Sequence, residues 1–262
     1  MVVVGAGHGH TRFGGLVAGR DNRVSGQYSV VAGGTQNAAS GRFSAVAGGQ
    51  DNEASGLQAA AGGGMSNLAS GQRSIVLGGE GNAAGKLYAA AGGGKDSSAS
   101  EVQSVVCGGE GNTTGSESAT SMGGHAGEAG SIVGPLDVGQ VVLGGSSNAA
   151  WGPYTFIAGG GLNGTTSSYE GAAVGGRSNF VSVGPQSLSL GGDDNNPSLG
   201  FGQTWGVLLG GREHNPPHYK STVVGGRNSS CYGESATIVG GTGGEQGALH
   251  GSSLGNCATC PD

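Results

Sequence analysis

Three short stretches of the sequence carry residues that bind metals or redox partners in other proteins. His8 and His10 stand near the start, Asp193-Asp194-Asn195-Asn196 offers oxygen ligands in the second half, and Cys257-x-x-Cys260 lies near the end. Each lacks the partners that its chemistry needs, because zinc sites take three or four converging ligands and a redox C-x-x-C sits in a βαβ unit. We interpret the histidines as surface residues, the acidic run as a loop, and the cysteines as a local disulfide or capping clip.

The opening segment VVVGAGHGH imitates a dinucleotide-binding strand and its glycine turn. The fingerprint needs a third glycine, but Gly5-x-Gly7 is followed by His10 at that place, and no βαβ pattern follows. No Ser/His/Asp set, metal-ligand cluster or pair of carboxylates recurs at a workable spacing elsewhere. The sequence therefore predicts a protein that is not an enzyme and that has no cofactor and no metal site.

A glycine pair recurs through almost the whole chain and sets its organisation. The first glycine of the pair recurs every 15 residues from Gly33 to Gly123, and then less regularly at Gly144, Gly159, Gly175, Gly191, Gly210, Gly225 and Gly240. One period reads Gly-Gly-x-x-Asn-x-Ala-Ser-Gly-x-x-Ser-x-Val-x. Glycines this frequent disfavour helices, and the apolar runs before each pair suit short strands. The pattern predicts an all-β, Gly-rich parallel β-solenoid with coils of about 15 residues.

The strands of this solenoid are apolar on both faces, because Val31 faces one way while Val30 and Ala32 face the other. One face fills the coil, so the other must pack on something outside it. An identical neighbour is the simplest candidate, and a threefold bundle is the arrangement that we prefer. The residues that we assign to the core or to the oligomer contact are Val30, Val31, Val46, Val76, Val106, Val142 and Val223.

An asparagine recurs four residues after the glycine pair. We predict that these side chains form a stacked amide ladder inside one corner of the coil, each bonding the next. The alternative is that asparagine only tolerates a left-handed turn position there. The predicted ladder residues are Asn37, Asn52, Asn67, Asn82, Asn112, Asn148 and Asn163, with Asn22, Asn179 and Asn195 on the same pattern.

The composition restricts the function classes. The chain has 262 residues, 62 glycines, 5% aromatic residues and a net charge of −6 without a basic stripe, so nucleic acid is a poor partner. We expect no membrane insertion and find no secretory signal, which leaves a fragment, another export route or a virion protein. Sequons at Asn112, Asn163 and Asn228 would accept glycans in a secretory pathway.

The regularity of the repeat divides the chain into four parts: degenerate coils at 1–28, regular repeats at 29–125, irregular repeats with insertions at 126–245, and a cap or tail at 246–262. Insertions in repeat proteins map to loops that often form the binding face. The candidate surface contacts are therefore Trp151, Tyr154, Trp205 and Tyr219, in the part from 132 to 220, with 29–125 as a shaft. A structural role, in which the large aromatics plug a coil end or line an oligomer axis, is the reading that we favour.

The units SVVAGGTQNAASG, SAVAGGQDNEASG and SIVLGGEGNAAG resemble the head repeats of trimeric autotransporter adhesins of the YadA type, and similar units occur in phage and giant-virus fibre proteins. The likeness covers about residues 16–245. It implies a left-handed parallel β-roll, a homotrimer or filament, and a surface-binding role toward a host surface or glycan. We therefore expect an extracellular, cell-surface or virion-surface structural fibre or adhesin head, without a coiled-coil stalk or membrane anchor.

The alternative function is a single-chain solenoid with an ice- or glycan-binding face. Ice binding needs a flat, regular array of Thr or Ser. The serine column at Ser29, Ser44, Ser74 and Ser104 is interrupted by alanine at positions 59 and 89, so we rank ice binding below the fibre.

Overall fold

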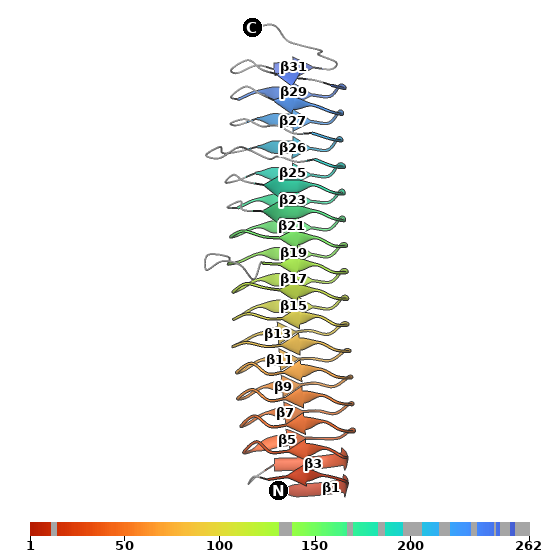
Figure 1. Ribbon diagram of the computed structural model, residues 1–262, viewed down its shortest axis with the longest axis vertical. Coiled ribbons are helices and arrows are strands. Elements are labelled where there is room, and N and C mark those ends of the chain that lie inside the picture. The colour runs from red at the N-terminus through yellow and green to blue at the C-terminus, as the bar shows by residue number, and fades with distance from the viewer. Residues whose placement is uncertain are drawn as a thin grey trace. The chain divides into compact units, whose positions relative to one another are not determined.

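The computed structural model describes residues 1–11, 15–130, 138–166, 170–182, 187–195, 206–214, 221–231, 235–243, 245–246 and 252–254. Every regular element in these ranges is a β-strand, and they contain no helix. The chain forms two compact units, Met1–Ala126 (unit 1) and Gly127–Asp262 (unit 2). In each unit the chain winds as a parallel β-solenoid (Figure 1).

Unit 1 contains two parallel ladders of short strands. Ladder A consists of β1 (Val2–Ala6), β3 (Gly15–Arg20), β5 (Ser29–Val31), β7 (Ala45–Val46), β9 (Ala60–Ala61), β11 (Ile75–Val76), β13 (Ala90–Ala91), β15 (Val105–Cys107) and β17 (Thr120–Met122). Ladder B consists of β2 (Gly9–His10), β4 (Arg23–Val24), β6 (Ala38–Ala39), β8 (Glu53–Ala54), β10 (Leu68–Ala69), β12 (Ala83–Ala84), β14 (Ser98–Ala99) and β16 (Thr113–Thr114). Each strand pairs with the strand one coil further along, as Val31 pairs with Val46.

Unit 2 also contains two parallel ladders, with strands of two or three residues. Ladder A there consists of β19 (Val141–Leu143), β21 (Phe156–Ala158), β23 (Ala172–Val174), β25 (Leu188–Leu190), β26 (Val207–Leu209), β27 (Thr222–Val224), β29 (Thr237–Val239) and β31 (Ser252–Leu254). Ladder B consists of β18 (Glu128–Ala129), β20 (Ala149–Ala150), β22 (Gly164–Thr166) and β24 (Phe180–Ser182), and a separate pair joins β28 (Ser230–Cys231) to β30 (Glu245–Gln246).

The second glycine of each pair is required by close stacking of the coils. Gly34 has φ +81°, and a Cβ there would lie 2.1 Å from the carbonyl oxygen of Gly49 in the next coil. The residue after the pair forms a single parallel bridge between coils, as Thr35 does with Gln50. The glycine corner is thus a third contact line along the solenoid, beside the two ladders.

The interior of the coils is thin and made of small side chains. In the coil that begins at Ser29, the buried residues are Ser29, Val31, Asn37, Ala39 and Gly41. Val31, Val46, Val76, Val106, Val142 and Val223 are all at most 1% exposed, so they belong to the core. Val30 lies on the outward face and is half-buried. The predicted parallel solenoid with coils of about 15 residues is confirmed.

The segment at the start of the chain that imitates a dinucleotide-binding strand is an ordinary coil of the solenoid. VVVGA forms β1, which pairs in parallel with β3 from Val2 with Leu16 to Ala6 with Arg20. His8 packs back on its own strand, with Nε2 3.0 Å from the carbonyl oxygen of Val4, and His10 is exposed on β2.

Candidate functional site

The asparagines of unit 1 form a buried ladder that runs from coil to coil. The Oδ1 of Asn37 accepts the backbone N–H of Asn52 at 2.9 Å, and the Oδ1 of Asn52 accepts that of Asn67 at 3.0 Å. The Nδ2 of Asn52 donates to the carbonyl oxygens of Gly48 and Gly64, both at 2.9 Å. Asn52 therefore joins three successive coils, the preceding one through its backbone N–H and the following one through its side-chain amide, and these bonds satisfy buried backbone groups of the tight corner.

The ladder also contains other residue types in place of asparagine. Ser97 stands in the place of asparagine, and its Oγ accepts the backbone N–H of Asn112 at 3.3 Å. In unit 2 the chain of bonds runs through Asn148, Asn163, Asn179 and Asn195. His214 then replaces asparagine, with its backbone N–H on the Oδ1 of Asn195 and its Nδ1 accepting the N–H of Ser229, both at 3.2 Å.

The alternative explanation for the asparagines, that they occupy a left-handed turn position, is wrong, because that position belongs to the preceding residue. The left-handed residue is the one before the asparagine, as Gln36 has φ 59° and Asp51 has φ 55°, while Asn37 and Asn52 are outside that region. The asparagine is therefore retained for its side chain.

His214 is only 1% exposed, although it lies in the part from 132 to 220 for which the sequence predicted surface contacts. Its Nε2 has no hydrogen-bond partner, and burial lowers the pKa of the ring below its ordinary value near 6.5, despite nearby backbone groups that raise it. The ring is therefore neutral, with Nδ1 as the acceptor. Only the 19-residue spacing from Asn195, where the repeat loosens, could have pointed to this role.

The outer face of unit 1 is the side of ladder A that points away from the coil interior. It consists of two residues from each of seven coils, Val30/Ala32, Ala45/Ala47, Ala60/Gly62, Ile75/Leu77, Ala90/Gly92, Val105/Cys107 and Thr120/Met122. None of these residues is charged. Leu77 is 59% exposed and Met122 43% exposed, which is unusual for large apolar side chains in a row on one sheet.

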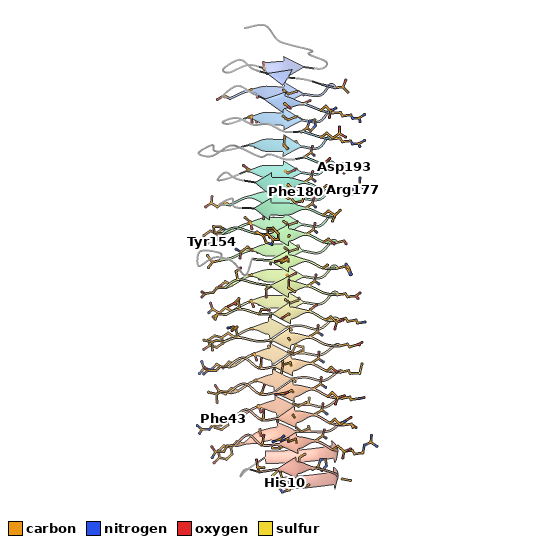
Figure 2. All side chains as sticks on the ribbon, viewed as in Figure 1. His10, Phe43, Tyr154, Arg177, Phe180 and Asp193 are labelled. Carbon is orange, nitrogen blue, oxygen red and sulfur yellow. The ribbon has the colours of Figure 1, made fainter. Side chains whose placement is uncertain are left out.

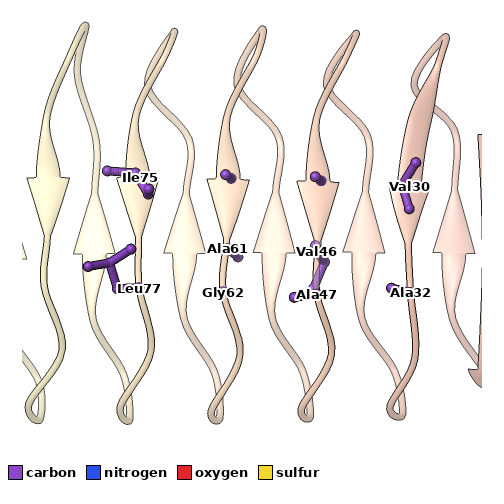
Figure 3. Close-up of a pocket in the computed structure, with 10 residues that line it drawn as sticks. Val30, Ala32, Val46, Ala47, Ala61, Gly62, Ile75 and Leu77 are labelled. Atoms are coloured by element: carbon purple, nitrogen blue, oxygen red, sulfur yellow. The ribbon is translucent and has the colours of Figure 1, made fainter.

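The middle of this face is hollowed. A depression of about 240 Å³ lies over the coils of Ala47 and Gly62, between Val30 on one side and Ile75 with Leu77 on the other (Figure 3). Its walls are side chains of Val, Ala, Ile and Leu and the backbone of Gly62. The hollow exists because two successive coils carry only alanine and glycine outward, next to Ile75/Leu77, the largest apolar pair on the face.

Two glycines beside this face, Gly33 and Gly48, are not explained by the chain itself. Gly33 has no positive φ, and a Cβ on it would meet no atom within 4 Å. Gly48 is also outside the left-handed region, and its Cβ would find only the Gly33 carbon at 3.9 Å. Small residues here leave room for another backbone to approach the outer face closely.

The outer face of unit 2 is also apolar. Its residues are Val141/Leu143, Phe156/Ala158, Ala172/Val174, Leu188/Leu190, Val207/Leu209, Thr222/Val224 and Thr237/Val239. The outward side of ladder B in unit 1 is different, because it carries Glu53, Thr113 and an exposed or half-exposed serine at Ser40, Ser55, Ser70 and Ser100. It also carries Ala38, Ala83 and Leu68, which is 37% exposed, so this side is mainly polar while the outer face of ladder A is apolar.

The opposite corners of the coils carry aromatic and charged side chains. In unit 1, Tyr28 and Phe43 project from the turns and stack at 5.4 Å between ring centroids, with the Arg42 guanidinium 4.7 Å from the Phe43 centroid (Figure 2). Arg73 donates to the hydroxyl of Tyr88 one coil further on. The Tyr28–Phe43 and Arg73–Tyr88 contacts therefore join neighbouring coils, while Arg42 covers the ring of Phe43 beside it.

At the glycine corner of unit 2, Arg177 donates to both carboxylate oxygens of Asp193 at 3.1 and 3.2 Å (Figure 2). This contact lowers the pKa of Asp193 and raises that of Arg177. Arg212 forms ion pairs with both Asp193 and Glu213, and Arg227 forms a further ion pair with Glu213. The acidic run that was considered as a cation site is thus occupied by arginine at Asp193 and belongs to the amide ladder at Asn195.

The predicted surface aromatics are only partly described. Trp151 is 39% exposed and Tyr154 61% exposed, so neither fills a core within the chain. The other part of the structural reading, that the large aromatics line an oligomer axis, stays a prediction. Trp205, Tyr219 and the two insertions lie outside the described residues, as do Cys257 and Cys260. Cys107 is exposed and free.

The prediction of a glycan acceptor is wrong for two of the three sequons in the folded chain, because their asparagines are buried. Asn112 and Asn163 are at most 1% exposed and belong to the amide ladder, whereas Asn228 is exposed. The serine column considered for ice binding is also internal, since Ser29, Ser44, Ser74 and Ser104 are at most 1% exposed.

Within the described ranges, no three His, Cys, Asp or Glu side chains gather as a metal site. The part of the chain that the structure describes has no helix long and apolar enough to cross a membrane. No protein-family model matches the sequence, and a search of the curated proteins found no similar one.

Proposed function

We propose that this protein is a structural β-solenoid that assembles with copies of itself into a fibre or adhesin head on the outside of a cell or virion. The observation that carries the proposal is the uncharged outer face of ladder A, beside a polar ladder B. A sheet face of this kind is stable in water when another surface covers it. A regular array of identical coils offers copies of the chain a matching repeat of about 4.8 Å.

The resemblance to adhesin heads and fibre proteins supports the extracellular setting. In this proposal the ladders, the buried asparagines and the stacked corners hold the coils, while the outer face holds the assembly. Host or glycan contact then falls to exposed side chains such as Trp151 and Tyr154.

The proposal is tested by sedimentation equilibrium of the full chain and of three neighbouring variants. Ala47→Asp places a charge on the outer face and is expected to weaken association about a hundredfold or more without unfolding the coils. Ser40→Asp places the same charge outward from ladder B and is expected to leave the mass unchanged. Val46→Asp buries the charge in the coil and is expected to prevent folding.

A folded chain that stays at 25.1 kDa at every concentration would overturn the proposal. It would leave the alternative of a single-chain solenoid with a glycan-binding face. Masses of two or three chains would both support self-association, and the threefold bundle expected from the resemblance is distinguished from a pair by the same measurement.

A further inference from the structure

The outward side chains of unit 1 vary in size from coil to coil in a definite order. Numbering the seven coils from Val30/Ala32 to Thr120/Met122, the largest apolar pair is Ile75/Leu77 in the fourth coil. The second, third and fifth coils carry only Ala and Gly, and the sixth and seventh carry Val105/Cys107 and Thr120/Met122. The face therefore has a hollow over the second and third coils, before Leu77, and a raised stretch at the sixth and seventh coils, beyond it.

From this order we infer that two copies of the chain pack face to face through unit 1 in opposite directions, related by a twofold axis between the fourth and fifth coils. The inference rests on the proposed self-association and specifies its register. A twofold contact is self-complementary, so each residue that meets a second residue is met by it in return.

The twofold axis places large side chains on small ones at every level. Leu77 lies over Gly92 of the second copy and Ile75 over Ala90 of the second copy. Cys107 and Met122 lie over Gly62 and Ala47 of the second copy, so they enter the hollow of about 240 Å³ (Figure 3). Filling such a hollow restores the close packing that an apolar contact needs.

The same axis also pairs opposite charges at both rims of the face. At the glycine corner, Glu80 of the fourth coil meets Lys95 of the fifth coil of the second copy, and the symmetry repeats this pair. At the turn corner, Arg42 of the second coil meets Glu117 of the seventh. All four side chains are exposed in the single chain and are long enough to meet at a rim. Charge complementarity of this kind fixes register more than it adds affinity.

Other registers lose the charge pairs or part of the packing. An arrangement with the coils level faces each coil with the same coil of the second copy, so that Leu77 meets Ile75, the glycine corner meets the turn corner, and hollow lies against hollow. Moving the antiparallel twofold axis by half a coil onto the fourth coil places Leu77 on Leu77 and Glu80 beside Glu80. Moving it by a whole coil, to lie between the third and fourth coils, keeps Leu77 over Gly62, but it sets Ala90/Gly92 against Ala45/Ala47, small against small, and puts Lys95 opposite Gln50, without charge pairs.

Crosslinking through introduced cysteines tests the register. The variants Glu80→Cys and Lys95→Cys, each in a chain whose four cysteines at 107, 231, 257 and 260 are replaced by serine, are co-expressed as full chains with different affinity tags and treated with a short bismaleimide. We expect a crosslink between the two variants, located by mass spectrometry at residues 80 and 95, at least tenfold more abundant than the 80–80 crosslink of Glu80→Cys alone.

A dominant 80–80 crosslink would overturn this register in favour of an antiparallel pair whose axis lies on the fourth coil. Neither crosslink in a chain of multiple mass, the result expected for level coils, would overturn the antiparallel pair while leaving self-association intact. A folded monomer would overturn both proposals.

A second pair of variants tests the packing without relying on crosslinks. Gly92→Leu is tolerated by the single chain, because its nearest contact is the Cys107 Cα at 3.4 Å, but it occupies the place of Leu77 of the second copy. It should weaken association at least tenfold. Gly85→Leu, with its nearest contact at 3.9 Å on the ladder B side, is the matched control and should leave association unchanged. Equal effects of the two variants would contradict the register.

Discussion

The Oδ1 of Asn52 accepts both the backbone N–H and the side-chain Nδ2 of Asn67, each at 3.0 Å, although the two residues are a full coil apart. Asn67 in turn donates to the carbonyl oxygens of Gly63 at 2.7 Å and Gly79 at 2.9 Å. One buried amide thus connects its own coil to both neighbours. Since the core contains few large side chains, these polar contacts are a large share of what holds adjacent coils in register.

Replacing Asn67 by alanine should therefore destabilise unit 1 by about 1–3 kcal/mol, because the N–H of Asn82 and two glycine carbonyls lose a buried partner. Asn67→Ser should cost less, since Ser97 already serves as the acceptor at this position in another coil. Urea unfolding followed by circular dichroism measures both, with the exposed Ser70→Ala as the control. Equal stability of Asn67→Ala and Ser70→Ala would show that the ladder is not stabilising.

His214 should make unit 2 sensitive to acid. Burial lowers its pKa below the ordinary value near 6.5, so the unfolded chain takes up the proton more readily than the folded one. The contribution of neutral His214 is fully present above about pH 6.5 and is lost as pH falls toward the lowered folded-state pKa. Protonation also removes the acceptor for the N–H of Ser229.

The variant His214→Asn restores the residue of the other coils and should flatten the decline of unit 2 stability between pH 7.5 and 5. Hydrogen exchange of the strands β26 and β27, read by mass spectrometry, reports the local effect. His125→Asn changes an exposed histidine in unit 1 and should leave the pH dependence as it is. An unchanged decline in His214→Asn would exclude His214 as its source.

The two glycines of a pair should respond very differently to alanine. Gly49 has φ +85°, and its Cβ would lie 2.2 Å from the Gly64 carbonyl oxygen, so Gly49→Ala should cost more than about 2 kcal/mol. Gly48→Ala meets only the Gly33 carbon at 3.9 Å and should leave the stability of the coil within about 0.5 kcal/mol of the original. Thermal unfolding of the two variants checks the contrast, and similar losses would mean that the corner is not tightly stacked.

The period of the sequence was enough to predict the solenoid, its coil length and the alternation of Val31 inward and Val30 outward. It was not enough to place every residue. Ala45-Val46-Ala47 is apolar throughout, so Val46 was a candidate for the oligomer contact until the structure showed it inside the coil. The sequon at Asn163 misled for a related reason, because the same residue type fits both a glycan acceptor and a buried ladder.

The outer face was the least predictable part of the candidate site. The residues at positions 62, 77, 92 and 107 are Gly, Leu, Gly and Cys, and their order has meaning only once they are known to stand in one outward row. His214 was hidden for another reason, since the long spacing before it removed the asparagine signal that marks the ladder elsewhere. The insertions, where specific contacts were predicted, lie outside the described residues.

The covering of the outer face by a second copy is tested most directly through Cys107, which is exposed on that face in the single chain. The unmodified full chain is labelled with N-ethylmaleimide at about 100 times the dissociation constant found by sedimentation, and peptide mass spectrometry follows Cys107 alone. The account predicts labelling roughly fifteenfold slower than in the unfolded chain, because only the dissociated fraction, about 7% of the chains for a twofold pair at this concentration, reacts. Labelling of folded chain at the rate of the unfolded chain would contradict it.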